Sequence, residues 1–263
     1  MELKKVALIV RGGVSTVDSK WTYEQTNNDR INYEGTYNSI VKNIINANPD
    51  FIFDVFIHSW DVELAQSLIR LYRPISHSFE SNEIYSSEIK ERVNNCGVIL
   101  NDTTRDTFYR VTSQALAIKK SIQLVEGHVG KTQTTYEKCI ICRPDVLYMK
   151  KLDLSSYTES DSIYVNGPNT KGDLHFIMSY DNLIRFKNVY ESISPTNLPA
   201  PQKCVANFVK NFLQKPYIAD NLNMPTDLEV LRKISRKSLI HKLDIQEILD
   251  MGITVEQLKS YVS

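Results

Sequence analysis

Short apolar runs alternate along the chain with longer segments in which apolar residues recur every three or four positions. The short runs are rich in Val, Ile, Phe and Tyr and are bounded by polar or turn residues, which is typical of strands. They predict strands at 5–10, 51–58, 75–79, 138–142, 162–165 and 174–179. Helical patterns lie between or beside them, near 34–47, 61–72, 83–94 and 107–126.

The segment 107–126 has the clearest helical periodicity. Its apolar residues follow one another at intervals of four, three, four and three, which places them on one helix face. They are Val111, Ala115, Ile118, Ile122 and Val125. Strands that alternate with helices predict an α/β fold, with a mainly parallel sheet flanked by helices.

After about residue 180 the pattern becomes almost entirely helical. Thr226 with Glu229, and Thr254 with Gln257, have the spacing of capping boxes, which mark helix starts. We therefore expect a main domain at 1–220 and a helical C-terminal appendage at 221–263. The appendage could be a packing or oligomerising helical pair, which would make a homo-oligomer, or a module that binds another partner.

The charge balance and the hydropathy of the chain argue against binding to nucleic acid and against a membrane-spanning segment. The chain has 31 Lys and Arg residues against 31 Asp and Glu residues, so no global field draws it to nucleic acid or anionic lipid. No apolar run approaches the roughly 18 residues of a membrane-spanning helix. The first apolar stretch, 6–10, is too short for a signal peptide, so we expect a buried strand and a cytoplasmic protein.

Polar residues follow several of the predicted strands. Residues 11–13 are Arg-Gly-Gly, residues 58–61 are His-Ser-Trp-Asp, and residues 143–145 are Arg-Pro-Asp. In open α/β sheets ligands bind beyond the carboxyl ends of the strands. Arginine pairs with phosphate and glycine allows close backbone approach, so these positions indicate a polar ligand site. The alternative is a solvated sheet edge, because strand ends are often polar.

Three side chains near these strand ends could bind a metal ion or a proton. Asp145, after a buried strand, is a hard-oxygen ligand suited to Mg²⁺ or Mn²⁺ on a diphosphate. Asp173 and His175 are two residues apart, so on a strand they face the same side. One of them could complete a metal site, and one could act as a general base.

Two motif-like segments do not have the context that their chemistry requires. Cys139 and Cys142 are spaced like a redox or zinc pair, but inside a strand they point to opposite faces. We expect buried structural thiols. Residues 127–132 resemble the end of a phosphate-binding P-loop, but Val125 stands where the first glycine is needed, and a helix precedes them.

Four blocks, at 54–61, 71–74, 108–114 and 136–148, carry a family resemblance. Their order and spacing resemble a family of bacterial and viral GT-A-like glycosyltransferases associated with surface-polysaccharide or glycan synthesis. The resemblance covers roughly residues 4–190 and leaves the C-terminal segment outside. It implies a Rossmann-like domain that transfers a sugar from a nucleotide-sugar donor, by default a UDP-sugar, to a hydroxyl of a glycan or glycolipid acceptor.

The resemblance also implies roles for individual residues. Such enzymes carry an Asp-x-Asp motif that holds Mn²⁺ or Mg²⁺, and the matching position here reads Arg143-Pro144-Asp145, so only Asp145 carries over. Arg143 could instead neutralise phosphate itself. The implied metal ligands are Asp145 and His175, and the implied base is Asp173 or, second, His175. The implied donor-binding residues are Arg11, Gly12, Gly13, Trp60, Gln114, Lys119, Arg143 and Asp145.

Two other functions remain open from the sequence. The first is a non-catalytic module that binds nucleotide or glycan and assembles through its helical tail. The second is another nucleotide-dependent transferase, of the nucleotidyl or phosphoryl type, on a similar sheet.

Overall fold

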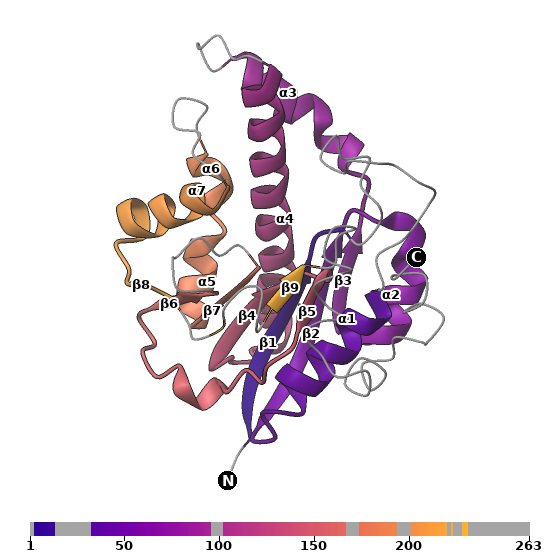
Figure 1. Ribbon diagram of the computed structural model, residues 1–263, viewed down its shortest axis with the longest axis vertical. Coiled ribbons are helices and arrows are strands. Elements are labelled where there is room, and N and C mark those ends of the chain that lie inside the picture. Colours follow the sequence, from indigo (N-terminus) through magenta and orange to yellow (C-terminus); the bar gives the residue numbers. More distant parts are fainter. Residues whose placement is uncertain are drawn as a thin grey trace.

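The main architectural feature is a seven-stranded sheet with helices against both faces (Figure 1). The computed structural model describes residues 3–13, 33–95, 102–166, 174–193, 201–219, 222 and 228–230. The strand order is β3-β2-β1-β4-β7-β6-β8, and every pairing is parallel except those that β7 makes with β4 and β6. The predicted α/β fold with a mainly parallel sheet is therefore confirmed.

The strands fall into two sheets. Those of the main sheet are β1 (Lys4–Arg11), β2 (Phe51–Ser59), β3 (Ser76–Phe79), β4 (Lys138–Cys142), β6 (Ile163–Val165), β7 (His175–Met178) and β8 (Tyr217–Ala219). The second sheet is an antiparallel pair of β5 (Val146–Tyr148) and β9 (Leu228–Val230).

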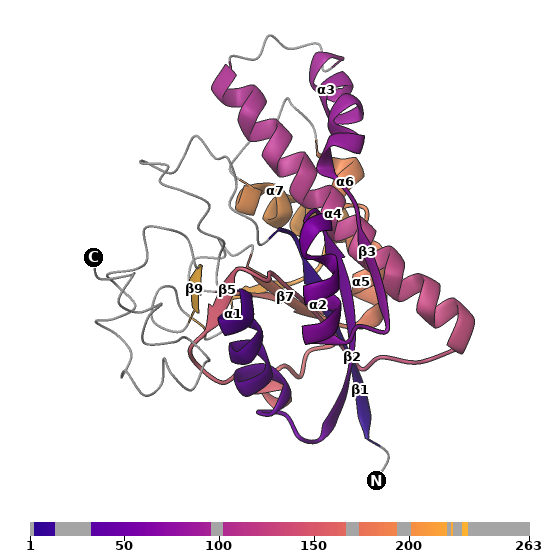
Figure 2. The ribbon, with the colours of Figure 1, turned by 90° about the vertical axis from the view of Figure 1, so that its right-hand side faces the viewer.

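The helices cover the sheet from both sides. They are α1 (Tyr33–Ile40), α2 (Ala65–Tyr72), α3 (Ser86–Asn94), α4 (Asp102–Thr132), α5 (Tyr180–Phe186), α6 (Val189–Ser192) and α7 (Pro201–Phe208). Figure 2 shows α1 and β5 on one side of the sheet and the C-terminal half of α4 with α5 on the other. None of the helices in the described residues combines the length and the apolar character that a membrane crossing needs.

The sequence of β1 explains why one strand supports two cores. Ala7 and Ile9 pack in the core that contains α4 to α7, whereas Val6, Leu8 and Val10 pack in the core that contains α1 and α2. A strand covered on both faces must be apolar at every position, which is why the run reads as continuous rather than alternating. The apolar stripe predicted at 107–126 lies on α4 and is buried in the first of these cores.

The order of the strands creates a topological switch point between β1 and β4. The chain adds β2 and then β3 on one side of β1, and places β4 on the other side. The register pairs Arg11 with His58 and Val10 with Cys142, so the carboxyl ends of β2, β1 and β4 lie side by side. This is the position at which Rossmann-like sheets bind their ligands.

The segment after residue 180 differs from the sequence prediction. It contains β8 and β9 as well as helices, and strands of three residues are too short to show an alternating pattern. Leu228, inside the predicted capping box, belongs to β9 and is fully buried against the core beside β5. Here long-range pairing overrides a local helix signal. Residues 231–263 lie outside the described part, so the division at 220 stays a prediction.

Candidate functional site

The loop after β1 brings its backbone against the end of β2. Gly12 has a φ of +109°, a conformation that residues with a side chain rarely adopt, and its N–H donates to the His58 carbonyl over 3.1 Å. A Cβ on Gly13 would lie 3.2 Å from Oδ2 of Asp61. The backbone conformation of Gly12 therefore favours glycine, whereas a side chain at Gly13 would press on the carboxylate of Asp61.

Asp61 is held by its own strand end. The Ser59 hydroxyl donates to Oδ2 of Asp61 over 3.4 Å and accepts from the Asp61 backbone N–H over 3.1 Å. Asp61 stands at the N-cap position of a short 3₁₀ turn, Val62–Leu64, but its carboxylate does not cap that turn. The carboxylate instead lies next to the glycine loop.

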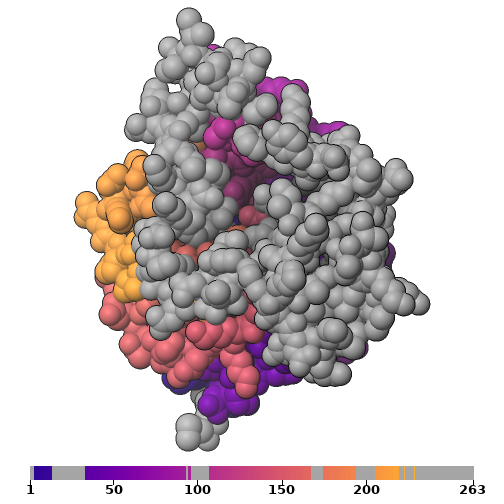
Figure 3. All heavy atoms as spheres, viewed as in Figure 1, coloured from indigo at the N-terminus to yellow at the C-terminus, as the bar shows by residue number. Residues whose placement is uncertain are grey.

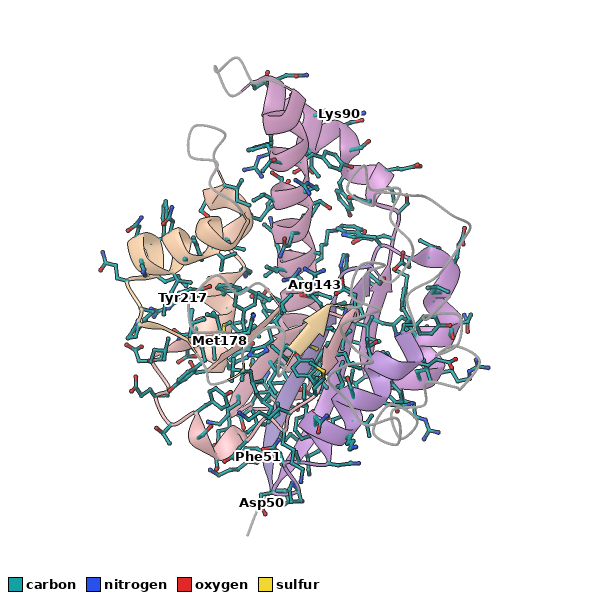
Figure 4. The ribbon with its side chains drawn as sticks, in the orientation of Figure 1. Asp50, Phe51, Lys90, Arg143, Met178 and Tyr217 are labelled. Carbon is teal, nitrogen blue, oxygen red and sulfur yellow. The ribbon has the colours of Figure 1, made fainter. Side chains whose placement is uncertain are left out.

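Arg143 and Asp145 form a bidentate ion pair just beyond the C-terminal end of β4. Nε of Arg143 donates to Oδ1 of Asp145 over 2.8 Å, and Nη2 donates to Oδ2 over 2.5 Å. The side chains are 14% and 7% exposed. The hydroxyl of Thr36 in α1 donates to the carbonyl of Pro144 over 2.6 Å and fixes the turn between them. Figure 4 labels Arg143 at one end of the sheet and Phe51, where β2 begins, at the other.

The predicted divalent cation does not fit the described residues at this turn. Both carboxylate oxygens of Asp145 accept hydrogen bonds from one guanidinium, so a cation there would lie beside a positive charge that repels it. Within the described ranges, no three His, Cys, Asp or Glu side chains gather closely enough to hold a metal ion. Asp173 lies outside those ranges. A role for Mn²⁺ or Mg²⁺ stays a prediction from the sequence.

His175 lies in the core beneath the same turn. It is the first residue of β7, it pairs with Cys142, and its side chain is completely buried. Its ring stacks on Tyr148, with the ring centroids 5.9 Å apart. The structure thus places this predicted base and ligand among packed side chains rather than at an open surface.

A second polar cluster connects the ends of β2 and β3 to α4. His58 Nε2 lies 2.9 Å from Oε1 of Glu80, and the Tyr85 hydroxyl donates to Oε2 over 2.7 Å. Lys120 of α4 donates to the Tyr85 hydroxyl and lies 3.5 Å from Oε1 of Glu80. We refer to His58, Glu80, Tyr85 and Lys120 as the His58 cluster.

Burial and the contacts within the cluster together set the charge states of His58 and Glu80. Burial lowers the pKa of His58 and outweighs the opposing effect of Glu80. Burial also disfavours the charged form of Glu80, but hydrogen bonds from Tyr85 and His58 and the charge of Lys120 leave its pKa below the usual value. His58 is therefore held neutral beside an ionised carboxylate, which fixes the tautomer with its proton on Nε2.

Trp60 places an aromatic ring over this cluster. Its ring meets that of His58 edge-on, with centroids 4.5 Å apart, and lies 5.9 Å from that of Tyr85. The side chain is partly exposed. The predicted ligand-binding tryptophan thus stands beside the strand ends, next to the buried imidazole.

The structure places the two predicted α4 residues away from the strand ends. Lys119 pairs with Glu191 and lies 5.1 Å from the ring centroid of Tyr190, both on α6. Gln114 lines a small apolar cavity together with Val189, Ile193 and other residues. Figure 3 shows the same face of the molecule as spheres, with α4 visible near its centre.

Sequence reasoning missed Glu80 and Lys120. Glu80 follows β3 directly, so the strand-end rule that selected Arg11, Trp60 and Arg143 would also have found it. Lys120 is the neighbour of the residue that was chosen, but one step along a helix turns the side chain by about 100°. The sequence shows that a lysine is near, and only packing decides which of the two reaches Glu80.

The solved structures described here are similar to this chain only distantly. No protein-family model matches the chain, and no curated protein matches its sequence significantly. Among solved structures, a glycosyltransferase involved in the glycosylation of the major capsid of PBCV-1 is 12% identical, with 82% of this chain and 81% of that chain covered and a TM-score of 0.34.

Two further solved structures are similar to the same degree. The inositol-1-phosphate CTP transferase from T. maritima is 9% identical, with 98% and 97% of the two chains covered and a TM-score of 0.44. Mouse xyloside xylosyltransferase 1 is 8% identical, with 82% and 84% covered and a TM-score of 0.39. All three are named as transferases, but likenesses this distant carry no argument about activity, so function must be argued from the strand ends.

Proposed function

We propose that the chain is a glycosyltransferase that moves a sugar from a nucleotide-sugar donor to a hydroxyl of a glycan or glycolipid acceptor. The observation that carries the proposal is the placement of Arg11 and Arg143 at the ends of adjacent strands, at the switch point between β1 and β4. A UDP-sugar is the default donor, and polysaccharide biosynthesis is the proposed setting, both from the sequence resemblance.

The charges at this edge suit the leaving group of such a transfer. When the bond from the sugar to the nucleotide breaks, negative charge grows on the departing diphosphate. Cationic groups that are already in place stabilise this charge without reorganisation, and guanidinium groups match phosphate oxygens in shape. Gly12 and Gly13 add a loop whose backbone can approach a phosphate closely.

The acceptor hydroxyl needs a group that takes its proton if the transfer inverts the sugar configuration. Asp173 is the proposed base from the sequence, just before β7. The proposed donor site extends from the turn at Arg143 to Trp60, whose partly exposed ring is suited to stacking against a flat ligand group.

Release of nucleoside diphosphate tests the proposal. Wild-type protein should slowly hydrolyse a UDP-sugar or another nucleotide sugar and should turn over faster with a suitable acceptor. Arg143→Met should lose most of this activity, whereas Arg70→Met, at an exposed position of α2, should keep it.

Other outcomes identify the alternative functions. Thermal stabilisation by nucleotide sugars without any turnover would favour a non-catalytic binding module. Consumption of nucleoside triphosphate with release of pyrophosphate would favour a nucleotidyltransferase.

A further inference from the structure

In the turn after β4, the carboxylate of Asp145 is bound by the guanidinium of Arg143. Asp145 accepts from two nitrogens of Arg143, in the parallel geometry that gives the strongest and most directional ion pairs. A divalent cation at this carboxylate would have to share it with the guanidinium, whose positive charge opposes the binding of a second cation. The pair is also largely buried, so water screens it only weakly.

The surrounding contacts hold the turn in place. Thr36 of α1 binds the Pro144 carbonyl, and Ser39, one helical turn further on, accepts from the backbone N–H of Tyr148 over 3.0 Å. Both hydroxyls are buried. The backbone on each side of Asp145 is therefore anchored to α1, which fixes the direction in which the guanidinium is presented.

An arginine paired with a carboxylate can match the charge of a carboxylate-bound metal ion. Two carboxylates that hold a divalent cation have a net charge of zero, and an arginine paired with one carboxylate has the same net charge. Replacing a carboxylate by arginine raises the formal charge by two, which is the charge of the cation itself. The Arg143–Asp145 pair thus has the same charge as a filled two-carboxylate metal site.

Arg11 adds a second positive charge at the neighbouring strand end. Its side chain is 3% exposed. Burial raises the pKa of the Cys142 thiol to about 12, and the positive charge of Arg11 opposes that shift, so this charge is felt at the end of β4. It is also one of the charges that lower the pKa of His58 after burial, so it reaches the end of β2 as well.

We propose that Arg143, positioned by Asp145, supplies the positive charge that a divalent cation would otherwise supply, so that this site binds nucleoside diphosphate without any metal. The inference rests on the proposed function, because it names what holds the diphosphate of the donor. Asp145 is a positioning residue in this scheme and does not touch the ligand.

Calorimetric titration with UDP tests the inference, once in excess EDTA and once with Mn²⁺. The wild-type dissociation constant should change by less than about threefold between the two conditions. Arg143→Gln should weaken binding in EDTA by at least tenfold, while Arg70→Met should bind as the wild type does. A wild-type protein that binds UDP only when Mn²⁺ is present overturns the inference and leaves the proposed function standing.

A charge-swapped variant gives an independent readout. Arg143→Asp restores two carboxylates, so it should bind Mn²⁺ directly, detected by the loss of the free-ion electron paramagnetic resonance signal, and should bind UDP only with Mn²⁺. Wild-type protein should leave the free-ion signal unchanged. If Arg143→Asp does not fold, the wild type and Arg143→Gln still decide the question. Absence of binding by UDP, GDP, ADP and CDP under both conditions overturns the proposed function and the inference with it.

Discussion

His58 Nε2 lies 2.9 Å from a carboxylate oxygen of Glu80, so a completely buried imidazole is oriented by an acid at the end of the neighbouring strand. Because a carboxylate can only accept, the proton of the neutral ring is on Nε2, and Nδ1 carries a lone pair. Among the described residues, Nδ1 has no hydrogen-bond partner. A ligand group that met this atom would have to donate, as a hydroxyl or an amide N–H does and an ionised phosphate does not.

The stability of the protein should depend on pH through His58. Burial lowers its folded-state pKa below the usual value of about 6.5, so the unfolded chain binds a proton more readily. The contribution is fully present above about pH 6.5 and is lost as the pH falls toward the folded-state pKa, with a slope of at most about 1.4 kcal/mol per pH unit. Urea unfolding measured between pH 5 and 8 checks this.

The matched variant is His58→Gln, which cannot take up the proton. Its free energy of unfolding should be lower near pH 7.5, but it should change less between about pH 6.5 and 5 than that of the wild type. His77→Gln, at an exposed position of β3, should keep the wild-type slope. Identical slopes for wild type and His58→Gln would show that this imidazole does not titrate differently in the folded state.

The two glycines after β1 should respond differently to alanine. At Gly12 a Cβ meets no atom within 4 Å, but its φ of +109° strains any side chain, so Gly12→Ala should cost about 1–2 kcal/mol. At Gly13 the backbone is not strained, but the new Cβ would lie 3.2 Å from Oδ2 of Asp61, so Gly13→Ala should shift that carboxylate, and the change in stability should be set by how easily the carboxylate moves. Denaturant unfolding gives both values.

A glycine on α4 supplies the control. A Cβ on Gly127 also meets no atom within 4 Å, and the residue lies inside a helix. Gly127→Ala should therefore stabilise the protein by roughly 0.5–1 kcal/mol. If Gly12→Ala and Gly127→Ala shift stability in the same direction, the backbone strain assigned to Gly12 is wrong.

The parts of the fold that the sequence predicts are those set by local patterns. The run at 6–10, inside the strand predicted at 5–10, is apolar throughout because helices cover both faces of the strand, and this shows in the sequence. The α4 stripe shows for a different reason, because one face of that helix is buried and its apolar residues recur with the helical period. Pairings between distant segments leave no such local trace, so β9 coincides with an apparent capping box at Thr226 and could not be recognised.

In the candidate site, too, local properties could be predicted from the sequence and contacts between side chains could not. The strand-end rule finds Arg11, Trp60 and Arg143, because a position beyond a strand is a local property. The rule does not show whether Asp145 binds a metal ion or Arg143, because the sequence Arg-Pro-Asp is compatible with both arrangements. Partner choice depends on side-chain direction, which the backbone of the folded turn decides.

The thiols of β4 should be inert in the folded protein. Cys139 and Cys142 are completely buried, and burial raises the pKa of both, so the reactive thiolate is scarce at pH 8. In a variant with Cys96→Ser and Cys204→Ser, a thiol reagent should label neither remaining cysteine until denaturant is added, and then both. Rapid labelling of the native variant would contradict the packing of β4.

Leu228 should be essential to the stability of the folded protein, although it lies in a segment that the sequence assigned to an appendage. It is fully buried, and β9 pairs it with Tyr148 at the end of β5, the strand that begins directly after Asp145. Leu228→Ala should lower the free energy of unfolding by about 3 kcal/mol, because it leaves a cavity in the core. Phe212→Ala, at a side chain that is 68% exposed, should change it by less than about 0.5 kcal/mol. Equal effects of the two substitutions would mean that β9 does not pack on β5 in solution, and the tail would then be separable from the turn that holds Arg143.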